Sequence, residues 1–158
     1  FKNRFERITF GDPLLTTQQD HVEIVNAICQ EFSNLPADCA LILMGHGTSH
    51  YANDVYAALD YRFKDLGFSN IHLATVEGYP TLENVTRMVK EQEAKKVILA
   101  PFMIVAGDHA RNDMSGDDED SWKNQFRAAG YDVECRMKGL GEYPAIQDML
   151  IRHVTEVC

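Results

Sequence analysis

The stretch ALILMGHGT, residues 40–48, decides how this chain folds. Residues 40–44 are all apolar, and the glycine-rich tripeptide after them marks a sharp turn. A strand that is apolar at every position is typical of a parallel sheet whose two faces are both covered. The stretch therefore predicts a buried parallel strand that runs into a polar loop.

The same pattern, an apolar run followed by a polar loop, returns at 71–80 and at 97–114. The strand candidates are 71–76 and 97–105, of which the second has the stronger signal. In an open parallel sheet the carboxyl ends of the strands line one edge, and ligands bind in the crevice there. We therefore expect the polar side chains of the three loops to meet.

Three of those side chains suit a divalent transition metal: His46, Glu77 and His109. His46 lies between two glycines, where the backbone can come close to a ligand. The Gly-Tyr-Pro turn after Glu77 leaves this carboxylate at the crevice. We expect these three residues to be both the metal ligands and the catalytic residues.

The segments between the strands show the spacing of amphipathic helices. In chain order we expect a helix from a capping box at Thr16, a strand at 40–44, a helix at 51–66, a strand at 71–76, a helix capped by Thr81, a strand at 97–105, a helix around Trp122 that ends at Gly130, a weaker strand at 133–137 and a helix from Pro144. This alternation predicts an α/β fold, an open parallel sheet of about four strands with helices on both faces. We find no linker or repeat, so we expect residues 1–158 to form a single domain.

The composition excludes several classes of protein. The net charge of −9 argues against nucleic-acid binding, and no apolar run is long enough to cross a bilayer. The four cysteines form no C-x-x-C pair, so neither a zinc knuckle nor a disulfide scaffold is expected. The first residues resemble no signal peptide, which favours the cytoplasm; an exported form stays open, because the chain begins with Phe1 rather than Met.

A nucleotide cofactor is not expected either. The turn at 45–47 begins like G-x-G-x-x-G but lacks the third glycine, and Glu77 lies 32 residues after Gly45 instead of about 20. His50, four residues after His46, is expected in the first turn of the next helix rather than in a two-histidine metal pair. The remaining histidines, 21, 72 and 153, are expected to be structural.

Five motifs together resemble the class II chelatases, most closely the cobaltochelatases of CbiK type. They are MGHG at 44–47, VEGYP at 76–80, AGDHARNDM at 106–114, DSWK at 120–123 and GLGE at 139–142. The resemblance runs over nearly the whole chain. It corresponds to the second lobe of that two-lobed family, with the first lobe absent, so the resemblance implies that the chain pairs either with the missing lobe or with a second copy of itself.

The resemblance implies insertion of Co²⁺ into sirohydrochlorin, without ATP, on the anaerobic route to cobalamin. His46 and His109 match the metal-binding histidines, and Glu77 matches the acidic residue beside them. A carboxylate there can also accept the protons that the pyrroles lose. For the tetrapyrrole itself we expect contacts from Gly45, Thr48 and Arg111, the last as a cationic partner for substrate carboxylates.

Other functions stay open at this point. The same ligands would accept Ni²⁺ or Fe²⁺, for a related tetrapyrrole. A non-catalytic carrier of metal or tetrapyrrole could use the same histidine pair, although it would need no proton acceptor. Metal-dependent hydrolysis would need a separate base, for which the sequence offers no motif.

Overall fold

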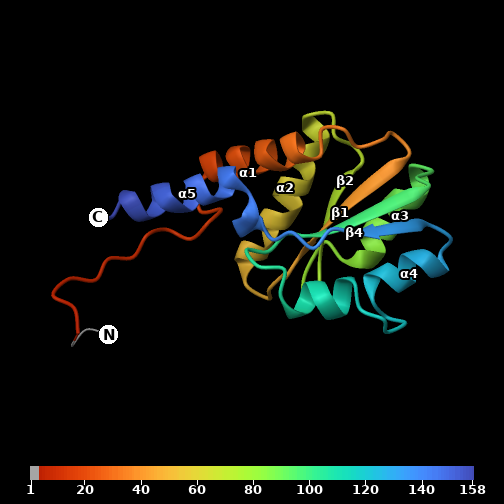
Figure 1. The fold of residues 1–158 in the computed structure, drawn as a ribbon. Coiled ribbons are helices and arrows are strands. Elements are labelled where there is room, and N and C mark those ends of the chain that lie inside the picture. The colour runs from red at the N-terminus through yellow and green to blue at the C-terminus, as the bar shows by residue number, and fades with distance from the viewer. Residues whose placement is uncertain (1–3) are drawn as a thin grey trace.

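A computed structural model describes residues 4–158 and shows an α/β fold built on one parallel sheet (Figure 1). The strands are β1 (Cys39–Gly45), β2 (Ile71–Thr75), β3 (Lys96–Pro101) and β4 (Asp132–Cys135), in the spatial order β2-β1-β3-β4. Gly45 pairs with Thr75 across one neighbour, and Met44 pairs with Pro101 across the other. Strands β2, β1 and β3 therefore end nearly level, and the loops after them share one edge. The predicted fold class is confirmed.

Helices cover both faces of the sheet (Figure 1). They are α1 (Gln18–Glu31), the 3₁₀ turn η1 (Tyr51–Asn53), α2 (Asp54–Asp65), α3 (Leu82–Glu91), the π-helical turn η2 (Ala110–Met114), α4 (Trp122–Ala128), the 3₁₀ turn η3 (Leu140–Glu142) and α5 (Pro144–Thr155). Alternate residues of β1 point to opposite faces. Leu41 and Leu43 pack with α1, α2 and α5, whereas Ile42 and Met44 pack with α3, α4 and η2. This double burial explains why β1 is apolar throughout.

The first helix begins one residue later than predicted. Thr17, not Thr16, is the N-cap, and its hydroxyl accepts from the Asp20 amide while the Asp20 carboxylate accepts from the Thr17 amide. The Thr16 hydroxyl donates instead to the Pro13 carbonyl, at 2.7 Å. The capping box exists, but the residue that completes it is Asp20, three residues after Thr17, and not Gln19, three residues after Thr16.

The third strand is shorter than predicted, ending at Pro101 instead of Val105. The next residues leave the sheet, because the Leu140 amide donates to the Met103 carbonyl at 2.8 Å and the Gly141 amide donates to the Ile104 carbonyl at 2.9 Å. Val105 is 70% exposed, so its apolar character does not reflect burial. His109 therefore follows a loop and lies at the start of the helical turn η2, and does not follow the strand directly.

The other differences from prediction are small. Strands β2 and β4 end at Thr75 and Cys135, one and two residues earlier than expected, and β4 begins one residue earlier. The helix expected at 51–66 consists of η1 followed by α2. The His50 ring caps η1 by accepting from the Ala52 amide, so His50 lies at the start of the helical segment, as expected.

Candidate functional site

The loops after β1 and β2 pack backbone against backbone at the edge of the sheet. The Glu77 amide donates to the His46 carbonyl at 2.9 Å, and the Val76 amide donates to the Gly45 carbonyl at 3.1 Å. Gly47 has φ +82°, and a Cβ there would lie 2.7 Å from the Gly78 nitrogen. Only glycine combines that backbone conformation with so close an approach. The Gly-His-Gly sequence thus holds His46 beside Glu77.

The structure brings together the three side chains that the sequence singled out. The rings of His46 and His109 meet edge to face, with centroids 4.6 Å apart. The His46 Nδ1 lies 3.9 Å from the Glu77 Oε2. Side-chain exposure is 48% for His46, 59% for Glu77 and 35% for His109, so the group opens to solvent. The expected convergence at the strand ends is therefore confirmed.

Sequence reasoning missed a specific partner of His109. The Asp113 Oδ2 lies 2.5 Å from the His109 Nδ1, across the π-helical turn η2. Since the ionised carboxylate can only accept, His109 donates from Nδ1 and keeps the lone pair of Nε2 for another ligand. The spacing of four residues was the available signal, but the sequence did not show that a helical turn begins at this point. Single π-helical turns are rare and are frequent at functional sites.

Metal binding by His46, Glu77 and His109 stays a prediction. Within residues 4–158, no group of three or more His, Cys, Asp or Glu side chains is already arranged as a metal-binding cluster. The His46 Nδ1 lies 2.8 Å from the Gly47 carbonyl oxygen. The donor types nevertheless suit cobalt, because imidazole is a ligand that divalent transition metals favour and a carboxylate can complete such a site.

The three residues expected to contact the substrate lie around this edge in different settings. Gly45 is buried at the end of β1, where a Cβ would lie 2.4 Å from the Tyr56 ring. Thr48 is exposed, and so is Arg111 on η2. The position of Gly45 has a sufficient packing reason, and its role toward a substrate stays a prediction, as do those of Thr48 and Arg111.

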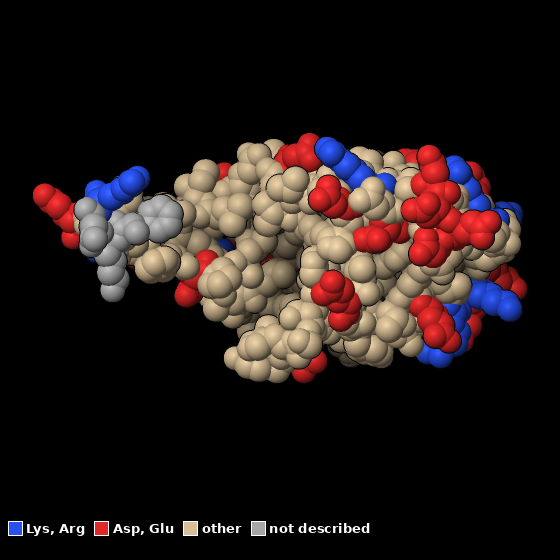
Figure 2. All heavy atoms as spheres, turned by 90° about the horizontal axis from the view of Figure 1, so that it is seen from below, with Lys and Arg blue, Asp and Glu red and all other residues tan. Residues whose placement is uncertain are grey.

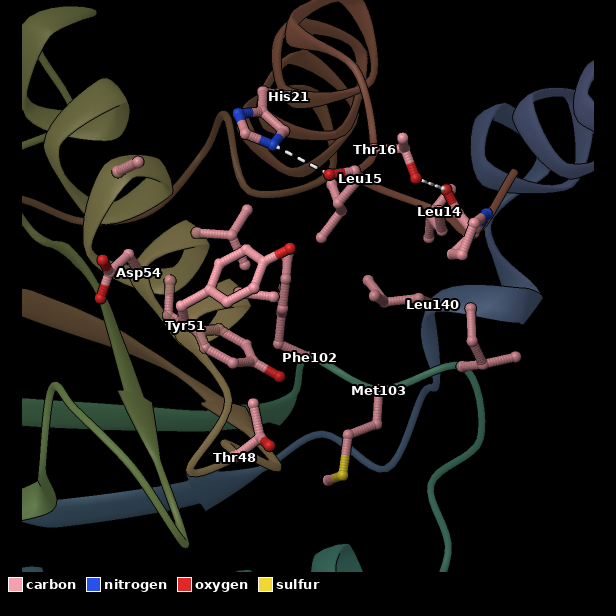
Figure 3. A pocket seen from close by; sticks show the side chains of 16 residues that line it. Leu14, Leu15, Thr16, His21, Thr48, Tyr51, Asp54, Phe102, Met103 and Leu140 are labelled. Atoms are coloured by element: carbon pink, nitrogen blue, oxygen red, sulfur yellow. Dashed lines mark hydrogen bonds between the residues drawn. The ribbon is translucent and has the colours of Figure 1, made fainter.

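A pocket of about 780 Å³ adjoins the loop after β1, with Thr48 in its lining. Figure 3 shows that its side chains come from segments far apart in the sequence, among them Leu15, Tyr51, Phe102 and Leu140. The lining is mostly apolar. No sequence pattern pointed to this pocket, because each of these residues alone is an ordinary apolar residue.

The surface charge is uneven on one face of the molecule. Seen from below in Figure 2, the molecule is hollowed where few charged side chains gather, while Asp and Glu collect toward the end remote from the N-terminal tail.

None of the helices within residues 4–158 is long and apolar enough to cross a membrane.

Comparison with known proteins gives a consistent result. The family model described as cobalt chelatase (CbiK) matches residues 1–158. The chain is 40% identical to the sirohydrochlorin cobaltochelatase of Salmonella typhimurium over 150 residues, which is 95% of this chain and 56% of that protein. It is 33% identical to the sirohydrochlorin cobaltochelatase CbiKC of Nitratidesulfovibrio vulgaris, covering 96% of this chain and 54% of that protein. The chain thus spans about half the length of the curated relatives that it matches.

A solved structure supports the fold independently. A multi-domain protein of Deinococcus radiodurans, described as structurally similar to chelatases, superimposes with a TM-score of 0.56 at 18% identity, covering 85% of this chain and 29% of that one. At that identity the likeness concerns the fold alone. Since the family model matches its full length, the chain belongs to the CbiK family of cobalt chelatases.

Proposed function

We propose that this chain carries the metal-inserting site of an ATP-independent chelatase that places Co²⁺ into sirohydrochlorin, in anaerobic cobalamin biosynthesis. Family membership and the names of two relatives support the reaction class. The observation that carries the proposal is the meeting of His46, Glu77 and His109 at one strand edge, with ring centroids 4.6 Å apart for the two histidines. This is the combination that metallation needs, a pair of neutral nitrogen ligands beside a carboxylate.

In the proposed reaction the substrate metal is taken up by the imidazoles of His46 and His109. The hydrogen bond to Asp113 holds His109 in the tautomer with a free Nε2 lone pair. As the pyrrole nitrogens replace the imidazoles on the metal, each of two pyrroles loses its proton, and Glu77 accepts from them before releasing the protons to solvent. Its side chain is 59% exposed, so the protons have a route to water.

The macrocycle is proposed to lie over the same edge, with an apolar face toward the pocket that Tyr51, Phe102 and Met103 line. Thr48 lies where the site and the pocket meet. Arg111, exposed on the same turn as Asp113, is the proposed cationic partner of a substrate carboxylate. Gly45 is proposed to let the macrocycle approach the end of β1.

A tetrapyrrole cleft needs a second wall, because the side chains of the site are between one third and three fifths exposed. We propose that the second wall is either a further lobe or a second copy of this chain. Ile104 lines the pocket and is 44% exposed, and the next residue, Val105, is 70% exposed, so both would gain from being covered. Light scattering over a range of concentrations, together with activity, tests this. Full activity of a strict monomer would contradict it.

The reaction itself is tested by mixing sirohydrochlorin and Co²⁺ with the chain, without nucleotide, and following the absorbance of the macrocycle. We expect metallation faster than the uncatalysed rate, and loss of that acceleration in a variant with both His46→Ala and His109→Ala. Parallel reactions with Ni²⁺ and Fe²⁺ determine the metal preference, which the ligand types alone leave open. No acceleration with any of these metals would refute the proposal.

A further inference from the structure

Asn53 occupies an unusual position for an asparagine that precedes a helix. It is the last residue of η1 and the N-cap of α2, and its side chain is only 8% exposed. Asparagine is favoured at an N-cap because its side chain accepts from the first turn of the helix. Here it makes no such bond. The side chain of Asn53 is therefore engaged elsewhere.

Its amide group joins the two loops that carry His46 and Glu77. The Asn53 Oδ1 accepts from the Thr48 amide at 3.0 Å, and the Asn53 Nδ2 donates to the Tyr79 carbonyl at 2.7 Å. Thr48 lies two residues after His46, and Tyr79 lies two residues after Glu77. One buried side chain thus uses its acceptor on one loop and its donor on the other.

The loop after β2 is shaped to admit this side chain. A Cβ at Gly78 would lie 2.3 Å from the Asn53 Oδ1, a distance that no real Cβ contact allows. Glycine at 78 lets the amide pass between the loops. On its far side the loop is closed onto β2, because the Thr75 amide and hydroxyl both donate to the Pro80 carbonyl, at 2.7 and 3.0 Å. Asn53 is the side chain that ties this closed loop to the loop of His46.

We propose that Asn53 is a positioning residue, which holds the loop of the metal ligand His46 in register with the loop of the proton acceptor Glu77. The inference rests on the proposed function. The strand-like bonds between the loops involve residues 45–46 and 76–77, so they end just where the catalytic side chains begin. Beyond them, at residues 48 and 79, Asn53 continues the connection. Without it, the two backbone bonds at residues 45–46 and 76–77 are left to set the distance between His46 and Glu77.

The chain offers a matched control at the opposite end of the same strand pair. The Asn70 Nδ2 donates to the Cys39 carbonyl at 2.9 Å and to the Pro36 carbonyl at 3.4 Å, so Asn70 also ties the β2 side to the β1 side by two bonds. Asn53→Ala and Asn70→Ala each remove an amide group with two side chain–backbone bonds. Only the first removal is near the site.

The primary readout is the metallation rate, with Co²⁺ affinity measured separately by titration of the protein with Co²⁺ alone. We expect Asn53→Ala to lower the rate about tenfold or more, as is usual when a support of a metal ligand is lost, and Asn70→Ala to leave it within about twofold. Thermal unfolding of both variants corrects for lost stability. Equal losses of rate in the two variants would overturn the inference.

A double variant separates positioning from general weakening. If Asn53 acts by placing Glu77 against His46, Asn53→Ala adds less than about a twofold further loss in a Glu77→Gln background, because residues that act together are not additive. Full additivity would show that Asn53 acts by another route and would count against the inference.

Hydrogen exchange gives a readout that needs no substrate. We expect the amides of Thr48 and its neighbours, and those of residues 76–79, to exchange faster in Asn53→Ala than in Asn70→Ala. A wild-type chain that fails to metallate would refute the proposed function, while unchanged exchange in Asn53→Ala would refute the inference whatever the activity. The two failures are therefore distinguishable.

Discussion

Two regions of this molecule use histidine in opposite ways. At the carboxyl edge of the sheet, His46 and His109 are half-exposed, and each uses Nδ1, toward Gly47 and Asp113. In α5, His153 is 6% exposed and uses both nitrogens, Nδ1 with the Asp12 carbonyl and Nε2 with the Asp20 Oδ1, each at 2.9 Å. Among the residues that the structure describes, no hydrogen bond engages the Nε2 atom of His46 or of His109. A histidine with a free nitrogen is suited to bind; one with two engaged nitrogens is suited to stabilise.

The surroundings reinforce the contrast. Asp20 is fully buried, and it also accepts from Arg152 at 2.9 Å. The cluster of Asp20, Arg152 and His153 links α1, α5 and the segment before α1, so its groups satisfy one another. At the strand edge the charges face solvent instead. The comparison predicts that changes at the edge affect chemistry and that changes in the cluster affect stability.

The strongest test removes the free nitrogens. We expect His46→Ala and His109→Ala each to abolish metallation and to weaken Co²⁺ binding by more than about 10²-fold, the upper cost of losing a mere support of a ligand. Both side chains lie outside the core, so circular dichroism and the unfolding midpoint should stay near wild type. Wild-type cobalt affinity in both variants would remove these residues from the site.

The next test addresses Glu77. Glu77→Gln keeps the shape of the side chain but cannot accept a proton, so we expect tetrapyrrole binding to persist while the rate falls by about 10²- to 10⁴-fold. The quenching of tetrapyrrole fluorescence and the absorbance assay measure the two properties separately. An unchanged rate would mean that the protons leave by another route, and a carrier role would then gain support.

The third test moves to the buried cluster. Asp20→Ala leaves Arg152 and His153 without their shared partner, and we expect a loss of about 3 kcal/mol in the free energy of unfolding, typical of breaking a buried ion pair. Asp117→Ala is the control, because its pair with Lys123 involves a fully exposed carboxylate, and we expect a much smaller loss of stability there. Urea unfolding measures both. A loss of cobalt affinity beyond the loss of stability would break the comparison.

The smallest expected effect is a pH dependence. Hydrogen bonds to the Asp12 carbonyl and the Asp20 carboxylate hold the pKa of His153 above its ordinary value, although burial and Arg152 act the other way. The stability from His153 is therefore complete below about pH 6.5, its unfolded value, and is lost as the pH rises through the higher folded pKa. For the buried His72, burial lowers the pKa, so its effect has the opposite sign.

Measuring the unfolding free energy of wild type and of His153→Gln over a pH series separates the contribution of His153 from that of His72. We expect the difference in unfolding free energy between the two proteins to shrink as the pH rises above neutrality. A difference that stays constant, or that grows with pH, would show that His153 is not stabilised as a cation.

Much of the fold was predictable because its signal is local. Residues 40–44 are apolar at consecutive positions, which is the pattern of a strand buried on both faces, and β1 has that environment. Apolar character misled at 102–105, where the strand was extended too far. The pattern predicts a strand through Ile104 and Val105, but the carbonyls of Met103 and Ile104 accept from the amides of Leu140 and Gly141. Sequence periodicity cannot predict such a contact between remote segments.

The candidate site was predictable in part for the same reason. His46, Glu77 and His109 follow apolar runs, and parallel topology brings the ends of such runs to one edge. Asp113 and Asn53 were missed as partners of the site. Asp113 requires the helical turn of η2, and Asn53 requires two loops that lie apart in the sequence to pass within hydrogen-bond distance of one side chain.

By itself, the sequence determined the class of fold, the order of strands and helices along the chain and the residue types at the strand ends, because these depend on hydrophobic pattern and on local turn chemistry. Only the tertiary structure decided which histidines keep a free nitrogen, where β3 stops, how the apolar pocket forms and how Asn53 joins two loops. Those features depend on distances between segments remote in sequence. Such distances follow from the packing of the whole chain, which no local pattern encodes.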